Sequence, residues 1–140
     1  MTENFKIICN FIKDMSSETP NTSTYFFVRD KISKYKLNIS INSVAVKNGI
    51  IEVDMILKFF DKPEVLKKSH FEITYTSIVK VDEKISNKKE MEKIILCDVP
   101  NKVYPDLEKI FLNLLAGSGY PRIKFGKKID FTELYKKQAN

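Results

Sequence analysis

An α+β domain with its strands first and its helices last is the fold class that the sequence predicts. Between residues 5 and 81, four stretches alternate apolar and polar side chains, which is the two-residue period of a strand. Short turns separate the last three of these stretches, so consecutive strands must run antiparallel. After residue 90 the apolar spacing changes to three and four residues, which is typical of helices. We therefore expect one four-stranded antiparallel sheet with the C-terminal helices on one of its faces.

The first predicted strand covers residues 4–13 and is followed by a long crossover. Its alternation predicts that four side chains share one face: Phe5, Ile7, Cys9 and Phe11. Ile8 and Ile12 lie on the other face, and a strand that is apolar on both faces is either covered on both or lies at an interface. Residues 16–34 are rich in Ser, Thr and Pro, so we expect an irregular crossover that contains the aromatic cluster Tyr25-Phe26-Phe27.

Three further strands form a predicted meander. Leu37, Ile39 and Ile41 alternate with polar residues in the second strand, which we extend through residue 46. Asn48-Gly49 then predicts a hairpin, since both residues tolerate the positive φ of a type I′ turn. The third strand covers residues 51–59, a turn follows at residues 61–64, and the fourth strand covers residues 71–81.

Helical segments are expected after a charged loop at residues 82–89. A short helical piece around residues 91–95 ends before Pro100. The main helix begins near Tyr104-Pro105, because proline suits a first turn, and it ends at Gly117 and Gly119. Its apolar stripe consists of Leu107, Ile110, Phe111, Leu114 and Leu115. A last short helix lies around residues 131–135.

The composition favours a single domain over residues 1–140. The chain is 43% hydrophobic, which is enough for one core at this length. No apolar run approaches the about 18 residues of a membrane span, and the N-terminus lacks the basic region of a signal peptide. We therefore expect a cytoplasmic protein that does not insert into a membrane.

The spacing of the cysteines and the histidine indicates no metal-binding, redox or catalytic role. Cys9 and Cys97 have neither metal-ligand nor redox spacing, and we expect both to be buried as small hydrophobic residues. His70 is the one histidine, and no cluster of Cys, His or Asp surrounds it in the sequence. The sequence also lacks a paired base and nucleophile and a phosphate-binding glycine loop, so it predicts no metal, no cofactor and no enzyme.

The net charge of +6 leaves a nucleic-acid binder as a rival class. Most of the excess is C-terminal, because residues 122–137 contain six basic and two acidic side chains. A basic β-domain that binds single-stranded nucleic acid would lose affinity steeply with salt. The polar positions on the predicted strands argue against it, since Glu52, Asp54, Glu72, Thr74 and Thr76 are acidic or neutral where a phosphate track needs cations. We therefore expect no nucleic-acid partner.

Four stretches in colinear order resemble the SecB family of protein-export chaperones. In residues 13–21, Asp14 and Glu18 lie four residues apart and the strand breaks at Pro20-Asn21. In residues 71–79, a glutamate precedes an apolar run. Residues 90–105 contain a proline-asparagine pair and an aromatic-proline helix start, and residues 119–135 contain the Gly-aromatic-Pro and Asp-Phe elements that end the family pattern. Together the stretches cover most of residues 5–138.

The resemblance implies an ATP-independent chaperone with no cofactor and no catalytic residue. Family members are homotetramers, built as a dimer of dimers, in which the helices pack between layers of four-stranded sheets. Hydrophobic grooves hold unfolded precursor proteins, which pass to the SecA translocation motor.

The resemblance also carries over site residues. Asp14 and Glu18 match the carboxylates that receive the basic tail of the motor, and Glu72 matches a further acidic contact, although a family leucine falls on the neighbouring His70. The client groove is expected to be lined by Tyr25, Phe26, Phe27, Leu37, Ile39, Ile41, Tyr120, Phe125 and Phe131.

The chain departs from the family pattern in its charge and at a few positions. Its pI is about 9.2, whereas typical members are acidic. Lys31 replaces a common tryptophan, and Thr76-Ser77 replaces a pair of glycines. Because these departures concern the partner more than the fold, the alternative is a SecB-like chaperone with a non-export client, such as an antitoxin.

Overall fold

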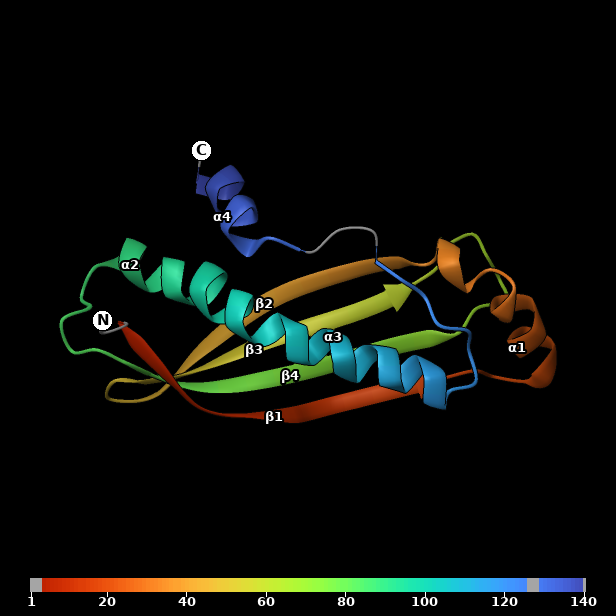
Figure 1. Ribbon diagram of the computed structural model, residues 1–140, viewed down its shortest axis with the longest axis horizontal. Coiled ribbons are helices and arrows are strands. Elements are labelled where there is room, and N and C mark those ends of the chain that lie inside the picture. The colour runs from red at the N-terminus through yellow and green to blue at the C-terminus, as the bar shows by residue number, and fades with distance from the viewer. Residues whose placement is uncertain (1–3, 126–128, 140) are drawn as a thin grey trace.

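Four strands form one antiparallel sheet in the computed structural model, which describes residues 4–125 and 129–139 (Figure 1). The strands are β1 (Phe5–Glu18), β2 (Lys36–Lys47), β3 (Ile50–Phe60) and β4 (His70–Val81). Their order in the sheet is β1-β4-β3-β2, and every neighbouring pair is antiparallel. The predicted four-stranded antiparallel sheet is therefore confirmed, with β1 and β2 at its two edges.

The helices follow the sheet and cover one of its faces. Helix α2 (Lys88–Lys93), the π-helical segment η2 (Ile94–Asp98) and helix α3 (Val99–Gly117) follow one another without a break and cross the sheet (Figure 1). Helix α4 (Phe131–Ala139) packs mainly on η2. In the part of the chain that the structure describes, no helix is long and apolar enough to span a membrane.

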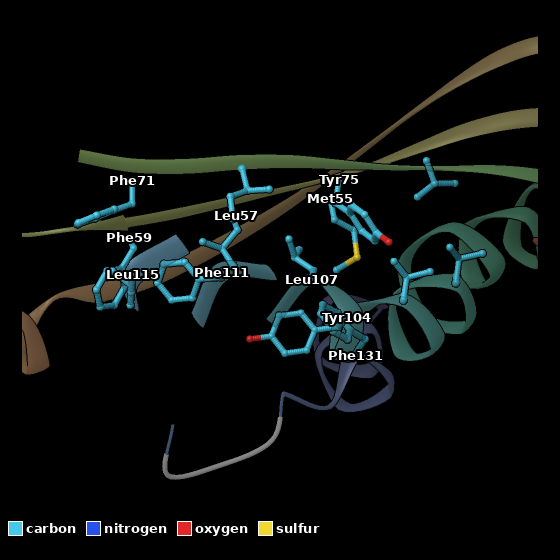
Figure 2. Packing of buried hydrophobic residues seen from close by; sticks show 14 of the residues in the cluster. Met55, Leu57, Phe59, Phe71, Tyr75, Tyr104, Leu107, Phe111, Leu115 and Phe131 are labelled. Carbon is cyan, nitrogen blue, oxygen red and sulfur yellow. The ribbon is translucent and has the colours of Figure 1, made fainter. Parts of the chain in front are cut away.

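The core lies between α3 and the central strands (Figure 2). The fully buried residues alternate along β3 and β4 and recur every four residues on α3: Val53, Met55, Leu57, Phe59, Phe71, Ile73, Val79, Val103, Leu107, Phe111 and Leu115. Phe59 and Phe111 join the two layers, with their ring centroids 4.9 Å apart in an edge-to-face arrangement. Each such side chain contributes about 1.5–3 kcal/mol on burial, so this interface fixes the position of α3 on the sheet.

The helical stretch from α2 through η2 to α3 does not have the predicted helix boundaries. The first helical piece does not end before Pro100, and the main helix does not begin at Pro105. Pro100 lies in the first turn of α3 directly after a π-helical turn, where its missing N–H costs least. Pro105 lies inside α3 on its exposed side, while Val103 and Leu107 on either side of it are buried in the core. This burial on both sides of the proline keeps the helix continuous.

Strand β1 is longer and less regular than predicted. It ends at Glu18 rather than at residue 13, and its pairing with β4 shifts at Ile8 and again at Lys13. Each shift adds one residue to β1 and changes which side chains share a face. Phe5 and Ile7 therefore lie on the helix-covered face, whereas Cys9 and Phe11 lie on the opposite face. The predicted common face of these four residues is wrong.

The two cysteines differ in their environment. Cys97 is buried in η2, as expected, but Cys9 is exposed. Cys9 is exposed because the shift at Ile8 turns it to the face that the helices leave uncovered.

The crossover contains a helix that the sequence analysis missed. Helix α1 (Thr22–Arg29) begins after Asn21, whose side chain accepts a hydrogen bond from the backbone N–H of Thr24 at 2.8 Å. Thr24 and Val28, one turn apart, are buried against the end of the sheet. Tertiary burial thus stabilises a helix whose Ser, Thr and aromatic residues have low helix propensity. The prediction of an irregular crossover is wrong for this segment.

The β2–β3 hairpin has the predicted position but another turn geometry. Gly49 has a φ of 73°, and Asn48 does not take a positive φ. A type I′ turn needs a positive φ at both residues, so the predicted turn type is wrong.

Candidate functional site

Three adjoining hollows lie on the helix side of the sheet, two along α3 and the third between β2 and α4, and we call them together the α3 groove. The first, about 410 Å³, lies between α3 and residues 122–124. The second, about 330 Å³, shares Pro105 and Glu108 with the first. The third, about 710 Å³, shares Ile129 and Phe131 with the second and reaches β2. The shared residues make the three hollows a row of neighbours.

The lining of the α3 groove is apolar with charged side chains around it. The apolar contributors come from β2, from α3 and from the segments after it: Leu37, Ile39, Tyr104, Pro105, Leu112, Leu115, Ile123, Ile129, Phe131 and Leu134. The charged contributors are Glu108, Lys109, Arg122, Lys124, Asp130, Glu133 and Lys137. The lining therefore offers a bound molecule both apolar contacts and charged groups.

Helix α4 forms one wall of the groove, and Asn101 of α3 holds it there. The Asn101 Oδ1 atom accepts a hydrogen bond from the backbone N–H of Phe131 at 3.1 Å, and its Nδ2 donates to Thr132 Oγ1 at 2.9 Å. The rings of Tyr104 and Phe131 meet edge to face with centroids 5.6 Å apart (Figure 2). Burial raises the pKa of Tyr104, and the nearby Glu108 raises it further, so this phenol stays protonated. These contacts place Ile129, Phe131 and Leu134 opposite the end of β2.

The nine predicted groove residues divide into separate sets. Leu37, Ile39 and Phe131 together line the third hollow. Ile41 is half-buried farther along β2, and Phe125 is half-buried against Phe111 with ring centroids 6.0 Å apart.

The four remaining aromatic residues lie at the end of the sheet around α1. Tyr120 is only 4% exposed, and the hydroxyl of Tyr25 donates to the Gly119 carbonyl at 2.6 Å. Phe26 and Phe27 are exposed, but they lie under cations, with Arg29 5.2 Å from the first ring and Lys31 5.2 Å from the second. These four residues do not line the three hollows.

Sequence reasoning missed seven of the ten apolar residues that line the groove. Leu112, Ile123, Ile129 and Leu134 line it, although none of them is among the nine predicted residues. A second stripe on α3 was the available signal, because residues 101, 104, 105, 108 and 112 recur at helical spacing beside the core stripe. Because this stripe mixes polar and apolar residues, the sequence alone predicts that this side of α3 faces solvent. Only the position of the neighbouring segments shows that it lines a groove.

The three predicted docking acids lie on the opposite face of the sheet, which we call the outer face. Asp14 pairs with Thr74 and Glu18 with His70 across the β1–β4 ladder, and Glu72 lies between these two positions on β4. Glu72 lies 3.9 Å from Lys58 Nζ and 3.6 Å from His70 Nε2. Asp14 and Glu18 are exposed, and within residues 4–125 and 129–139 neither forms an ion pair. The structure therefore brings the three carboxylates to one end of one face.

A second pair of acids on the outer face is already neutralised. Lys13 Nζ lies 2.5 Å from Glu52 Oε2 and 3.6 Å from Asp54 Oδ2. The hydrogen bond to Glu52 raises the pKa of Lys13, so the amine stays charged. Asp54 is nearly buried and accepts a further hydrogen bond from Thr76 Oγ1 at 2.6 Å.

Among the described residues, no group of His, Cys, Asp or Glu could hold a metal ion. The site therefore consists of an apolar groove on the helix side and an acidic patch on the outer face.

Comparisons with known proteins agree on one family. The whole chain, residues 1–140, matches the family described as preprotein translocase subunit SecB. It is 83% identical over 140 residues, with both chains fully covered, to a Pelagibacter ubique (strain HTCC1062) protein named as a putative protein-export protein SecB. It is 24% identical over 151 residues to the protein-export protein SecB of Anaplasma phagocytophilum (strain HZ), covering 99% of this chain and 94% of that one.

One solved structure has the same fold. It is the SecB-like chaperone Rv1957 of Mycobacterium tuberculosis, in complex with a ChAD peptide from the HigA1 antitoxin. The TM-score is 0.65 at 8% sequence identity, and the match covers 90% of this chain and 91% of that one. The family match over the full length, the close relative and the shared fold lead to one conclusion: the chain belongs to the SecB family and is a chaperone of protein export.

Proposed function

We propose that this protein binds unfolded precursor polypeptides in the α3 groove, without ATP, and delivers them to the SecA motor. The observation that carries the proposal is the row of three hollows, since neighbouring hollows share lining residues: Pro105 and Glu108 for the first two, Ile129 and Phe131 for the last two. A row of neighbouring hollows fits successive side chains of an extended chain.

The energetics of such a groove favour tight binding with little selectivity. Each client side chain that leaves water contributes roughly 1.5–3 kcal/mol. Ordering costs of about 0.5–1.5 kcal/mol for each immobilised side chain offset part of this gain. Several modest contacts along the groove therefore add up to stable binding, while no single contact demands a particular sequence.

Delivery to the motor uses the other face of the sheet in this proposal. Asp14 and Glu18 offer carboxylates that form no ion pair with any described residue, and Glu72 lies beside them. A basic partner segment gains charge-assisted hydrogen bonds there. Because the groove and the acidic patch lie on opposite faces, client and motor can occupy one subunit at the same time.

A matched pair of leucine variants tests the groove. Leu134 lines the third hollow and is 47% exposed, so Leu134→Asp leaves the core intact while it places a charge in the groove. We expect the Kd for a fluorescently labelled unfolded client to rise about tenfold, equivalent to about 1.4 kcal/mol. Leu66→Asp is the control, because Leu66 is 95% exposed on the β3–β4 loop and lines none of the hollows. Equal affinities of the two variants in fluorescence anisotropy would contradict the groove assignment.

Charge reversal tests the docking patch. Asp14→Lys together with Glu18→Lys should abolish binding of SecA in isothermal titration calorimetry while client binding is retained. Glu64→Lys together with Glu83→Lys is the matched control, since these exposed acids lie elsewhere and change the net charge equally. If the Asp14/Glu18 variant bound SecA as tightly as the wild type, the docking role would be wrong.

The alternative client class is tested in the same assay. The Mycobacterium tuberculosis structure holds an antitoxin peptide on the same fold, which supports a chaperone with a non-export client. Binding of an antitoxin-derived peptide together with no detectable affinity for SecA would favour that alternative. A shift of single-stranded DNA that disappears with rising salt would instead favour the nucleic-acid binder.

A further inference from the structure

We propose that the first hollow of the α3 groove makes this chaperone selective for client stretches in which acidic residues lie next to apolar ones. The inference rests on the proposed client-binding function. The residues that would set this preference are Lys109 of α3 together with Arg122 and Lys124 of the segment that follows it.

The three cations are not neutralised by an ion pair in the part of the chain that the structure describes. All three are exposed and line the hollow, and none of them forms an ion pair with any residue in the described ranges 4–125 and 129–139. On the outer face, Lys13 and Lys58 are both within 4 Å of carboxylates. Part of the positive charge of the chain therefore lies in the lining of the first hollow.

The one acid in the first hollow is directed elsewhere. Glu108 is the only carboxylate among the ten residues that line this hollow. It also lines the second hollow and interacts with the hydroxyl of Tyr104, one turn earlier on α3. Three cations and one carboxylate thus give the lining of the first hollow a net charge of +2.

The same hollow has an apolar floor. Leu112, Leu115 and Ile123 line it between the cations. An apolar client side chain can enter this floor while a neighbouring carboxylate stays at the wetter edge, within reach of Arg122 or Lys124. An acidic residue beside an apolar one satisfies both requirements, whereas a basic residue there would meet like charges.

The third hollow has the opposite charge character. Asp130 and Glu133 outnumber Lys137 in its lining. The groove is therefore cationic at the end near Arg122 and acidic at the end near α4, which would also favour one direction of the bound chain.

Two fluorescein-labelled peptides that differ only in charge provide the test. Both carry the same apolar eight-residue stretch of leucine and alanine, followed either by two aspartates or by two lysines. We expect the wild type to bind the aspartate peptide roughly 3- to 30-fold more tightly, because exposed charge pairs contribute modestly. Arg122→Gln with Lys124→Gln should remove most of this preference, and Lys109→Gln alone should reduce it.

A control variant separates the local effect from net charge. Lys84→Gln with Lys88→Gln removes the same charge from exposed positions outside the groove lining, and we expect it to keep the wild-type preference. An unchanged preference in the Arg122/Lys124 variant, or an equal loss of preference in the Lys84/Lys88 variant, would overturn this inference but not the proposed client-binding function. If neither peptide bound the wild type, or if Leu134→Asp weakened neither, the proposed groove itself would fail and the inference with it.

Discussion

At the scale of single residues, the outer face contains a buried carboxylate that two groups, Thr76 and Lys13, satisfy together. Asp54 is 9% exposed and accepts a 2.6 Å hydrogen bond from Thr76, which is fully buried. Lys13 reaches the other carboxylate oxygen from the bulge in β1. A carboxylate removed from water needs such partners, because an unsatisfied charge in the sheet destabilises the fold.

Removal of one hydroxyl tests this dependence. Thr76→Val keeps the shape of the side chain but leaves Asp54 without its shortest hydrogen bond. We expect the free energy of unfolding in urea to fall by about 1–3 kcal/mol, the usual effect of leaving a buried polar group unsatisfied. Thr74→Val is the control, since Thr74 lies on the same face of β4, is half-buried and its hydroxyl forms no hydrogen bond in the described part of the chain. A loss of the same size in both variants would show that the hydroxyl of Thr76 has no special role.

At the scale of elements, the position of α4 depends on one side chain of α3. Asn101 reaches both Phe131 and Thr132 at the start of α4, and Phe131 in turn contacts Tyr104. Cys97 of η2 adds a 3.2 Å contact to Thr132. The α4 wall of the groove is therefore held by side chains from η2 and the first turn of α3, where the helix changes from π- to α-geometry.

Hydrogen exchange can measure how firmly α4 is held. Asn101→Ala removes two hydrogen bonds of about 0.5–1.5 kcal/mol each, so the opening of α4 should become roughly 5- to 150-fold more frequent. Amide exchange in residues 131–137 should speed up by this factor, while exchange in β3 stays unchanged. Asn113 is an exposed asparagine on the same helix whose side chain forms no hydrogen bond in the described ranges, so Asn113→Ala should leave α4 as protected as in the wild type. Unchanged exchange in Asn101→Ala would show that ring packing alone holds α4.

The elements also show which structural features a sequence can predict. The four strands and the apolar stripe of α3 were predicted correctly, because their periods are local and their burial is one-sided. The bulges at Ile8 and Lys13 were not, since an extra residue in a strand leaves no trace in composition and depends on the partner strand. The helix through Pro100 and Pro105 and the short helix α1 depend on burial against distant strands, which overrides local propensity.

At the scale of the whole molecule, the groove and the acidic patch lie on opposite faces of one sheet. The patch could be predicted, because the resemblance supplied its three carboxylates and strand pairing brings them to one face. The groove was predicted only in part, because its walls come from β2, α3, the segment after α3 and α4. Leu37, Ile39 and Phe131 were among the predicted residues, but Leu112 and Ile123 become groove residues only through tertiary contact.

Assembly is the remaining whole-molecule property of the proposed chaperone, and β1 is the best candidate for a contact between subunits. This strand has fourteen residues, lies at an edge of the sheet and leaves its outer edge unpaired within the described chain. It exposes Ile8 and Phe11 on the outer face and Ile12 and Met15 on the helix side. A long apolar edge strand favours pairing with another copy.

Two lysines on this edge should therefore break the assembly. We expect the wild type to have a mass of about four times 16.3 kDa in multi-angle light scattering, as for a dimer of dimers. Ile12→Lys with Met15→Lys should lower this mass while circular dichroism stays unchanged, because both side chains are more than 40% exposed and contribute little to the core. Val44→Lys with Val46→Lys places the same charges on β2, where the two valines are 55% and 52% exposed, and should leave the mass intact. If the β1 variant kept the wild-type mass, or if only the β2 variant dissociated, β1 would not form the contact between subunits. The contact would then lie at the other edge of the sheet or on the helices.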